Sequence, residues 1–237
     1  MENVSAPSGF PAALGAAAVA VVAASLAIVA FGVTRGTDPA VLLRDPAAEF
    51  RVPVYAGALS YLGVALLCAT SAITVFVAAL LRETRSLFAL VGAFTALLAF
   101  DDLFLLHEHV GPKHLGIPEV AFYALYAGIG LLVLRLLLGH FGVGPSAGLL
   151  VALVSLGLSA ATDLFVPGDT TLHIATAAIP QIVIEDLFKL AGWAAWFGFW
   201  ASLGIRVVST RLAAEASPAK GGNVQSIRRR KNSDSTV

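Results

Sequence analysis

The chain has 237 residues and a formal net charge of zero; 58% of its residues are hydrophobic, 13% are charged, and its mean hydropathy is +0.85. A soluble domain carries about 25% charged residues, so this composition excludes a soluble globular enzyme and a disordered chain. The zero net charge gives no overall attraction for nucleic acid, and the single cysteine, Cys68, excludes an intramolecular disulfide framework. We therefore expect an all-α, polytopic membrane protein in contact with membrane lipids.

Six apolar segments are long enough, or nearly so, to cross a bilayer, which takes about 20 residues of helix. The residues before the first segment include no lysine or arginine, so we interpret that segment as an uncleaved helix and not as a signal peptide. The sequence therefore predicts a six-helix transmembrane bundle within residues 1–209. The segments are Ala12–Val33, Val54–Leu81, Leu87–Leu106, Val120–Leu138, Ser146–Phe165 and Pro180–Ile205.

Lysine and arginine favour the cytoplasmic ends of membrane spans. With the N-terminus inside, ten of these residues lie on the inner side of the membrane and four on the outer side. The distribution predicts a multi-pass protein of the cell membrane, in bacteria the inner membrane, with both termini in the cytoplasm. In the first outer loop we also expect a short interfacial helix around Val41–Phe50.

Residues 210–237 have a different composition from the rest of the chain. They are rich in Ser, Asn, Gly and Lys and contain almost no large apolar residues, which is typical of a disordered segment. We interpret them as a basic cytoplasmic tail that helps to fix the topology. Contact of the run Arg228–Lys231 with anionic lipid head groups is the alternative.

Ionisable residues of the last four spans and their connections gather on the outer side, opposite the N-terminus. Carboxylates at membrane depth are unfavourable, and adjacent acids there need partners in the protein, a bound cation or protons. This distribution, more than any single motif, predicts where a functional site lies. The residues are Asp101, Asp102, His107, Glu108, His109, His114, Glu119, Asp163, Asp169, His173, Glu185, Asp186 and Lys189.

Helical spacing predicts how part of this set is arranged. Asp101 and Glu108 are seven residues apart, as are Asp102 and His109, so each pair is expected to share a helix face. Small residues at intervals of four on the fifth span are expected to point Asp163 into the bundle. We therefore expect acids from the third, fifth and sixth spans to meet at one depth.

These expectations lead to a hypothesis of a metal-dependent membrane enzyme, in which metal-activated water attacks a lipid or another amphiphile that enters laterally. The alternative is a structural network, in which the acids pair with Lys189 and cap neighbouring helices. The predicted catalytic residues are Asp101, Glu108 and Lys189. The predicted ligands of a divalent Zn, Mn or Fe ion are Asp102, His109, Asp163, Glu185 and Asp186.

The end of the third span and the residues after it resemble a segment of other membrane proteins. The stretch Asp101–Glu108, followed by Gly116-Ile117-Pro118-Glu119, resembles a D(D/E)…HE segment of uncharacterised bacterial multi-pass membrane proteins. The resemblance covers about 20 residues of the 237 and implies a membrane protein without implying any activity.

Two other functions are consistent with the sequence. A proton- or ion-coupled transporter would use the same acids as a relay, although no inverted repeat and no pair of broken helices is present in the sequence. A non-catalytic subunit of a larger membrane complex, or a homo-oligomer, would use the small-residue stripes as helix contacts.

Overall fold

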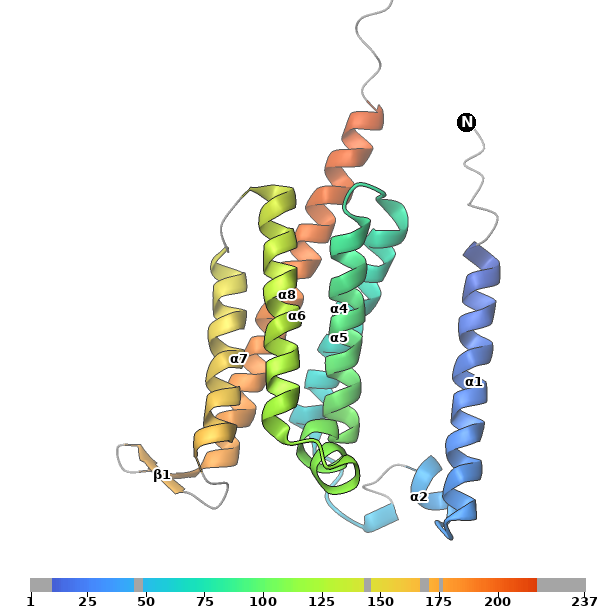
Figure 1. The fold of residues 1–237 in the computed structure, drawn as a ribbon, viewed down its shortest axis with the longest axis vertical. Coiled ribbons are helices and arrows are strands. Elements are labelled where there is room, and N and C mark those ends of the chain that lie inside the picture. Colours follow the sequence, from blue (N-terminus) through green and yellow to red (C-terminus); the bar gives the residue numbers. More distant parts are fainter. Residues whose placement is uncertain (1–9, 45–48, 143–145, 167–170, 175–176, 217–237) are drawn as a thin grey trace, which may run out of the picture. The chain divides into compact units, whose positions relative to one another are not determined.

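The computed structural model describes residues 10–44, 49–142, 146–166, 171–174 and 177–216, and it is almost entirely helical (Figure 1). The chain divides into two compact units, residues 1–58 and 59–237. We describe the two units separately.

The first unit contains α1 (Phe10–Thr34) and α2 (Pro39–Leu43). The Asp38 carboxylate caps α2 by accepting a hydrogen bond from the Ala40 N–H at 2.9 Å, and Pro39 occupies the first turn, where its missing N–H is harmless. Glycine at position 32 lets the helices touch, because a Cβ atom there would collide with Leu42. A short helix, α2, overlaps the first three residues of the predicted range Val41–Phe50, and residues 45–48 of that range lie outside the described residues.

The second unit is built on five long helices that run up and down in succession (Figure 1). They are α4 (Ala58–Leu80), α5 (Arg85–Phe104), α6 (Glu119–Phe141), α7 (Ala147–Phe165) and α8 (Gln181–Ala216). A π-helical segment, η1 (Leu106–Leu115), connects α5 with α6. Two short antiparallel strands, β1 (Thr171–Ile174) and β2 (Ala177–Pro180), precede α8, with Leu172 opposite Ile179.

The core of the second unit lies where α8 meets α4 and α5. Phe88 of α5 and Trp200 of α8 are fully buried and pack edge to face, with ring centroids 5.8 Å apart. The Trp196 indole N–H donates a hydrogen bond to Thr95 Oγ1 at 3.0 Å, which ties α8 to α5. Close backbone contact replaces large side chains between α7 and α8, since a Cβ atom at Gly192 would lie 2.5 Å from Leu156 Cδ2.

Each of the six apolar segments predicted as spans contains a long helix, although residues 54–57 form turns before α4, Leu105 ends α5 and Pro180 belongs to β2. Within the described residues, α4, α5, α6 and α7 are long and apolar enough to cross a membrane, and α1 contributes a shorter apolar stretch over Ser25–Thr34. The β1–β2 hairpin was not expected from the sequence. The last helix also continues well beyond Ile205, so that residues 210–216 of the predicted tail are helical; the remainder of that tail lies outside the described residues.

Candidate functional site

The site begins with an interruption between α5 and η1. Leu105 adopts a left-handed conformation with φ of 51°, which ends α5, and the wider π-helical turn that follows folds the chain back. The backbone N–H of His107 then donates to Asp101 Oδ1 at 2.8 Å, and its ring Nδ1 lies 2.6 Å from Asp101 Oδ2. Because an ionised carboxylate only accepts hydrogen bonds, the proton of the ring lies on Nδ1.

The other ring nitrogen of His107 is therefore available as a ligand. His107 is only 4% exposed, and its Nε2 atom has no hydrogen-bond partner among the residues that the structure describes. The nearest acidic contact is Glu108 Oε1, at 3.5 Å. Burial by itself lowers the pKa of the His107 imidazole, but its hydrogen bond to Asp101 and the charges of Asp101 and Glu108 raise this pKa above its ordinary value.

Two carboxylates from other helices converge on this imidazole. One ligand atom each from His107, Glu119 and Asp163 lie within 4.8 Å of one another. Glu119 is the first residue of α6, and Asp163 lies in the last turn of α7, where it accepts a hydrogen bond from the Tyr123 hydroxyl at 2.5 Å. One imidazole and two carboxylates supply three protein ligands, which is the number found in catalytic metal sites that keep an open position.

A second cluster surrounds Lys189 on α8. Its Nζ lies 3.3 Å from Glu185 Oε1 and 3.9 Å from an oxygen of each of three further carboxylates. The buried Glu185 also accepts a hydrogen bond from Gln181 Nε2 at 3.0 Å. Glu108 joins the two clusters, because the same oxygen that faces His107 also faces Lys189. The three further carboxylates belong to Asp102, Glu108 and Asp186.

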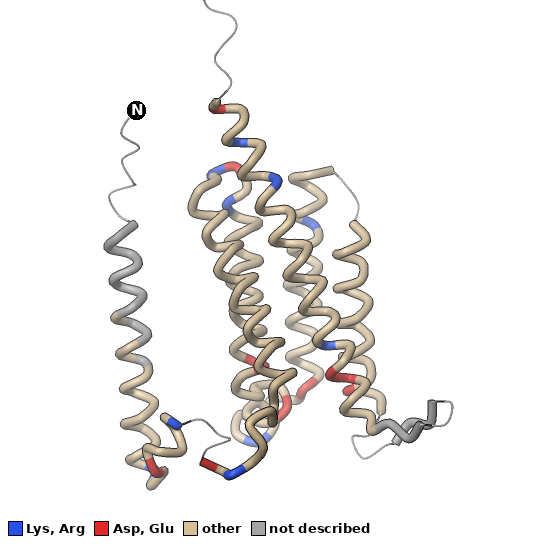
Figure 2. Tube along the Cα trace, turned by 180° about the vertical axis from the view of Figure 1, so that it is seen from behind, with Lys and Arg blue, Asp and Glu red and all other residues tan. Residues whose placement is uncertain are grey.

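Acids outnumber bases at this end of the second unit, which we call the polar end (Figure 2). Seven carboxyl groups of the two clusters and of Asp101 accompany one lysine and one histidine. Carboxylates removed from water need compensating charge or protons. Even with Lys113 of η1 included, the bases do not balance seven acids, and a bound divalent cation would reduce the excess.

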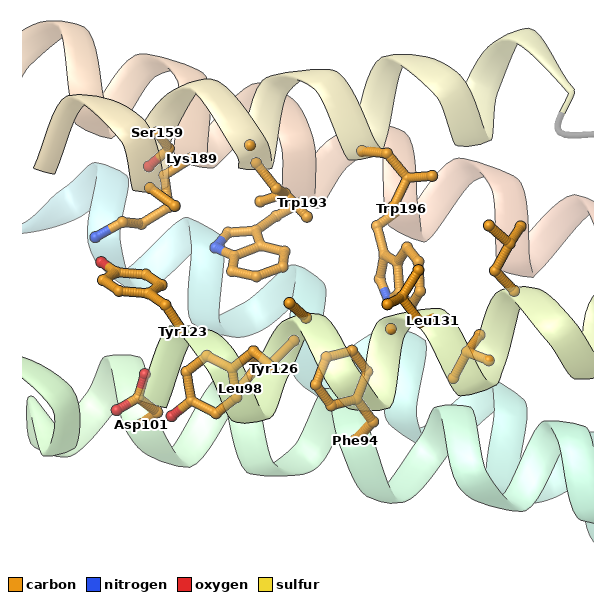
Figure 3. Close-up of a pocket in the computed structure, with 18 of the residues that line it drawn as sticks. Phe94, Leu98, Asp101, Tyr123, Tyr126, Leu131, Ser159, Lys189, Trp193 and Trp196 are labelled. Carbon is orange, nitrogen blue, oxygen red and sulfur yellow. The ribbon is translucent and has the colours of Figure 1, made fainter. Parts of the chain in front are cut away.

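A cavity of about 530 Å³ extends from the polar end along the helices. Asp101, Tyr123 and Lys189 line one end of it, and the remainder is lined by aromatic and aliphatic side chains such as Trp196 and Leu131 (Figure 3). Its walls come from α5, η1, α6, α7 and α8. The volume and the apolar lining with a few polar groups at one end are typical of a small-molecule site.

The predicted site residues divide between the two clusters. Of the predicted catalytic residues, Asp101 binds His107, while Glu108 and Lys189 lie within 4 Å of each other. Asp163 is the one predicted ligand that belongs to the group with metal-binding geometry. The other predicted ligands on α5 and α8, which are Asp102, Glu185 and Asp186, surround Lys189.

His109 lies apart from both clusters. It is exposed, and its Nδ1 accepts a hydrogen bond from Lys113 Nζ at 3.3 Å. Leu105 and the π-helical turn interrupt the α-helical spacing that suggested a face shared with Asp102, and they bring His107 inward instead. Of the residues noted in the loop before α8, Asp169 and the side chain of His173 lie outside the described residues.

Two members of the candidate metal group were not among the predicted ligands. His107 was part of the polar segment, but α-helical spacing alone gave no reason to prefer it to His109. Glu119 follows Pro118 at the start of a span, and this position is the signal that could have identified it, since it puts the carboxylate at the same membrane depth as Asp163.

Comparison with known proteins adds one match. A family model described as "Domain of unknown function (DUF8692)" matches residues 13–203, which include every residue of both clusters. No curated protein and no solved structure matches the chain.

Proposed function

Because the chain belongs to the DUF8692 family, whose description states no activity, we propose a function from the site itself: a metal-dependent membrane enzyme that acts on a lipid or another amphiphile. The observation that carries the proposal is the buried Nε2 atom of His107, which has no hydrogen-bond partner among the described residues, on a ring that has a nitrogen within 4.8 Å of ligand atoms of Glu119 and Asp163. A buried polar atom without a partner is unfavourable, and a metal ion would satisfy it.

The surrounding residues support a metal ligand role for His107. Metal-binding histidines usually donate their other ring N–H to a carboxylate, which fixes the ring and its tautomer. Asp101 does this here, at 2.6 Å. Tyr123 holds Asp163 in the same way that an outer hydrogen bond orients a ligating carboxylate.

The ligand set limits the metal and its chemistry. One imidazole with two carboxylates suits Zn²⁺, Mn²⁺ or Fe²⁺, and the oxygen-rich set favours the harder ions among them. Such an ion supplies Lewis acidity and lowers the pKa of a bound water. In this proposal Glu108, 40% exposed and facing both His107 and Lys189, accepts a proton during the reaction, and Lys189 polarises the substrate or offsets negative charge.

We propose six spans, α1 and α4 to α8, with both termini in the cytoplasm and the polar end at the outer face of a bacterial inner membrane. Residues 190–205 of α8 contain no charged side chain, and α1 has none over its whole length. The positive residues of the chain favour the same orientation.

The distribution of charge favours an enzyme over a proton relay. Between the polar end and the inner ends of α4 to α8, the one ionisable side chain is that of Arg135 on α6, and arginine stays protonated. A relay needs titratable groups across the whole membrane, whereas a hydrolytic site needs them at one depth only.

Metal analysis of the detergent-purified protein tests the proposal. We expect stoichiometric Zn, Mn or Fe in the wild type, and loss of most of it in His107→Ala, Glu119→Gln and Asp163→Asn. His140→Ala is the matched control, because His140 lies at the other end of α6 and bonds only its own helix. A metal-free wild type, or full metal content in all three ligand variants, would contradict the proposal.

The reaction is tested with the same preparations. We expect the wild type to hydrolyse members of a panel of long-chain esters and amides, detected by mass spectrometry, and to lose this activity on treatment with a chelator and regain it with the metal. Glu108→Gln should retain the metal and lose most turnover. Turnover that survives complete metal removal would exclude a metal-dependent reaction.

A further inference from the structure

We propose that the cavity beside the metal group binds an amphiphile with a single long hydrocarbon chain and a cationic head group, with the head at the polar end. The inference names the substrate class for the proposed enzyme and rests on that function for its reaction, but the binding itself is argued from the cavity alone.

The shape of the cavity fits one chain. Its lining extends from Tyr123 to Leu137 on α6 and from Lys189 to Trp200 on α8, which at the helical rise correspond to about 21 and about 17 Å. A volume of about 530 Å³ spread over such a length gives a mean cross-section of about 30 Å². A section of this size is sufficient for one extended hydrocarbon chain that lies along the cavity.

The polar end selects the charge of the head group. Seven carboxyl groups lie there with two lysines, Lys189 and Lys113 of η1. The excess therefore remains negative when a divalent cation is bound and His107, as its ligand, is neutral. An anionic carboxylate or phosphate head would be repelled by this excess, and an ammonium head would be attracted.

Buried polar atoms mark where the head group lies. The Nε1 atom of Trp193 is buried and has no hydrogen-bond partner among the described residues, and the buried hydroxyl of Tyr126 faces Asp101. Both residues line the cavity next to Asp101 and Lys189 (Figure 3). The indole N–H only donates, so it would be satisfied by an acceptor beside the ammonium head, such as the carbonyl oxygen of an ester or amide. The chain beyond would contact apolar side chains only.

The cavity also has a route of entry from the side. Leu131 of α6 and Leu153 of α7 line it and are nevertheless 67% and 39% exposed. The wall between α6 and α7 is therefore open at the depth of the apolar spans, where lipid chains lie in a membrane. A hydrophobic chain can enter there without crossing water.

Two glycines offer positions at which a larger side chain should fill the cavity. Gly130 and Gly157 line it, and a Cβ atom at either position would meet nothing within 4 Å. Gly130→Leu and Gly157→Leu should therefore occupy the space of the chain without displacing a neighbouring helix. Gly128→Leu is the matched control, because Gly128 has equally open surroundings on the same helix as Gly130 and does not line the cavity.

Tryptophan fluorescence reports occupancy directly, since the three tryptophans of the chain all line the cavity. In nanodiscs of zwitterionic lipid, we expect a long-chain amine with bromine atoms on its chain to quench this fluorescence saturably. The fatty acid with the same brominated chain should bind at least about tenfold more weakly, and an octyl amine should bind more weakly than a hexadecyl amine. The saturable phase should disappear in Gly130→Leu and Gly157→Leu and persist in Gly128→Leu.

Three results would overturn the inference. The first is fluorescence quenching that rises linearly with amine concentration in the wild type, as it does in Gly130→Leu and Gly157→Leu. The others are equal affinities for the fatty acid and the amine, or equal affinities for the octyl and hexadecyl amines. The metal content of the same samples separates the two proposals. Saturable quenching in a metal-free protein supports the cavity inference and contradicts the metal-dependent function. Linear quenching in a protein with stoichiometric metal contradicts the cavity inference and supports the metal-dependent function.

Discussion

At the scale of single residues, the pair Asp101–His107 determines what the site can do. Both side chains are buried, and two hydrogen bonds, one from the backbone and one from the ring, hold the imidazole against the carboxylate. Nε2 is thereby left without a partner among the described residues, on a ring that lies beside Glu119 and Asp163. A histidine held in this way is a better metal ligand than a mobile one, because its tautomer and orientation are set before binding.

Asp101→Asn should weaken metal binding without removing a ligand. Loss of an outer carboxylate of this kind lowers metal affinity about 10–100-fold, and competition with a chromophoric chelator measures the dissociation constant. Glu83→Gln serves as the control, since Glu83 is exposed and pairs with Arg211 away from the polar end. Equal dissociation constants for Asp101→Asn and the wild type would show that Asp101 does not orient a ligand.

The sequence predicted which residue types would gather, and less well which of them would meet. Asp101, Asp163, Glu185 and Lys189 could be placed at one membrane depth from the ends of their spans. The choice between neighbouring histidines depended on one left-handed residue in a π-helical turn, which has no pattern of hydrophobicity to reveal it.

At the scale of elements, close packing of α8 holds the site and the cavity together. α8 presents Lys189 to the acids of α5 and η1, and it presents Trp193 and Trp196 to the cavity. The apolar lengths of the helices predicted their existence, because a bilayer requires about 20 residues per span. The strands β1 and β2 are too short to leave a recognisable alternation.

Gly192→Ala should separate α7 from α8. The new Cβ atom would lie 2.5 Å from Leu156 Cδ2 and 3.2 Å from the Leu156 backbone nitrogen, so that the helices must move apart, at a loss in the free energy of unfolding of about 1–3 kcal/mol. Thermal denaturation in detergent measures this loss. Gly198→Ala on the same helix meets nothing within 4 Å and should leave stability unchanged; equal melting temperatures for both variants would contradict the predicted close packing.

Thr95→Val should destabilise the contact between α5 and α8. It removes the only acceptor recorded for the buried indole N–H of Trp196 among the described residues, and an unsatisfied buried donor costs about 1–3 kcal/mol. Chemical denaturation compared with Thr210→Val tests this, because the exposed Thr210 hydroxyl bonds only its own helix. Equal destabilisation by both substitutions would mean that the bond to Trp196 contributes nothing.

At the scale of the whole chain, composition and span length predicted a helical membrane protein, and the structure gives four helices of spanning length and composition together with α1 and α8. The cavity was not predictable in the same way. The cavity depends on which faces of α6 and α7 do not contact each other. Apolar residues line a cavity and a lipid-facing surface alike, so the hydrophobic pattern of a membrane helix does not distinguish the two.

Cysteine labelling tests the proposed topology. In a Cys68→Ser background, single cysteines at Lys113 and at Arg35 should react with a membrane-impermeant maleimide on intact cells, whereas one at Ser209 should react only after permeabilisation. All three positions are exposed on the protein surface. Labelling of Ser209Cys on intact cells would reverse the orientation, and opposite behaviour of the cysteines at Arg35 and Lys113 would exclude six spans.

The left-handed conformation of Leu105 has a consequence for how firmly the site is held. A non-glycine residue in this region costs roughly 1–2 kcal/mol, a penalty that glycine avoids, but glycine also gives the unfolded chain more conformational entropy. The strain is the larger of the two effects, so leucine lowers the free energy of unfolding relative to glycine. In return leucine makes this junction stiff: the chain that carries His107 leaves α5 in one direction, whereas glycine would allow many.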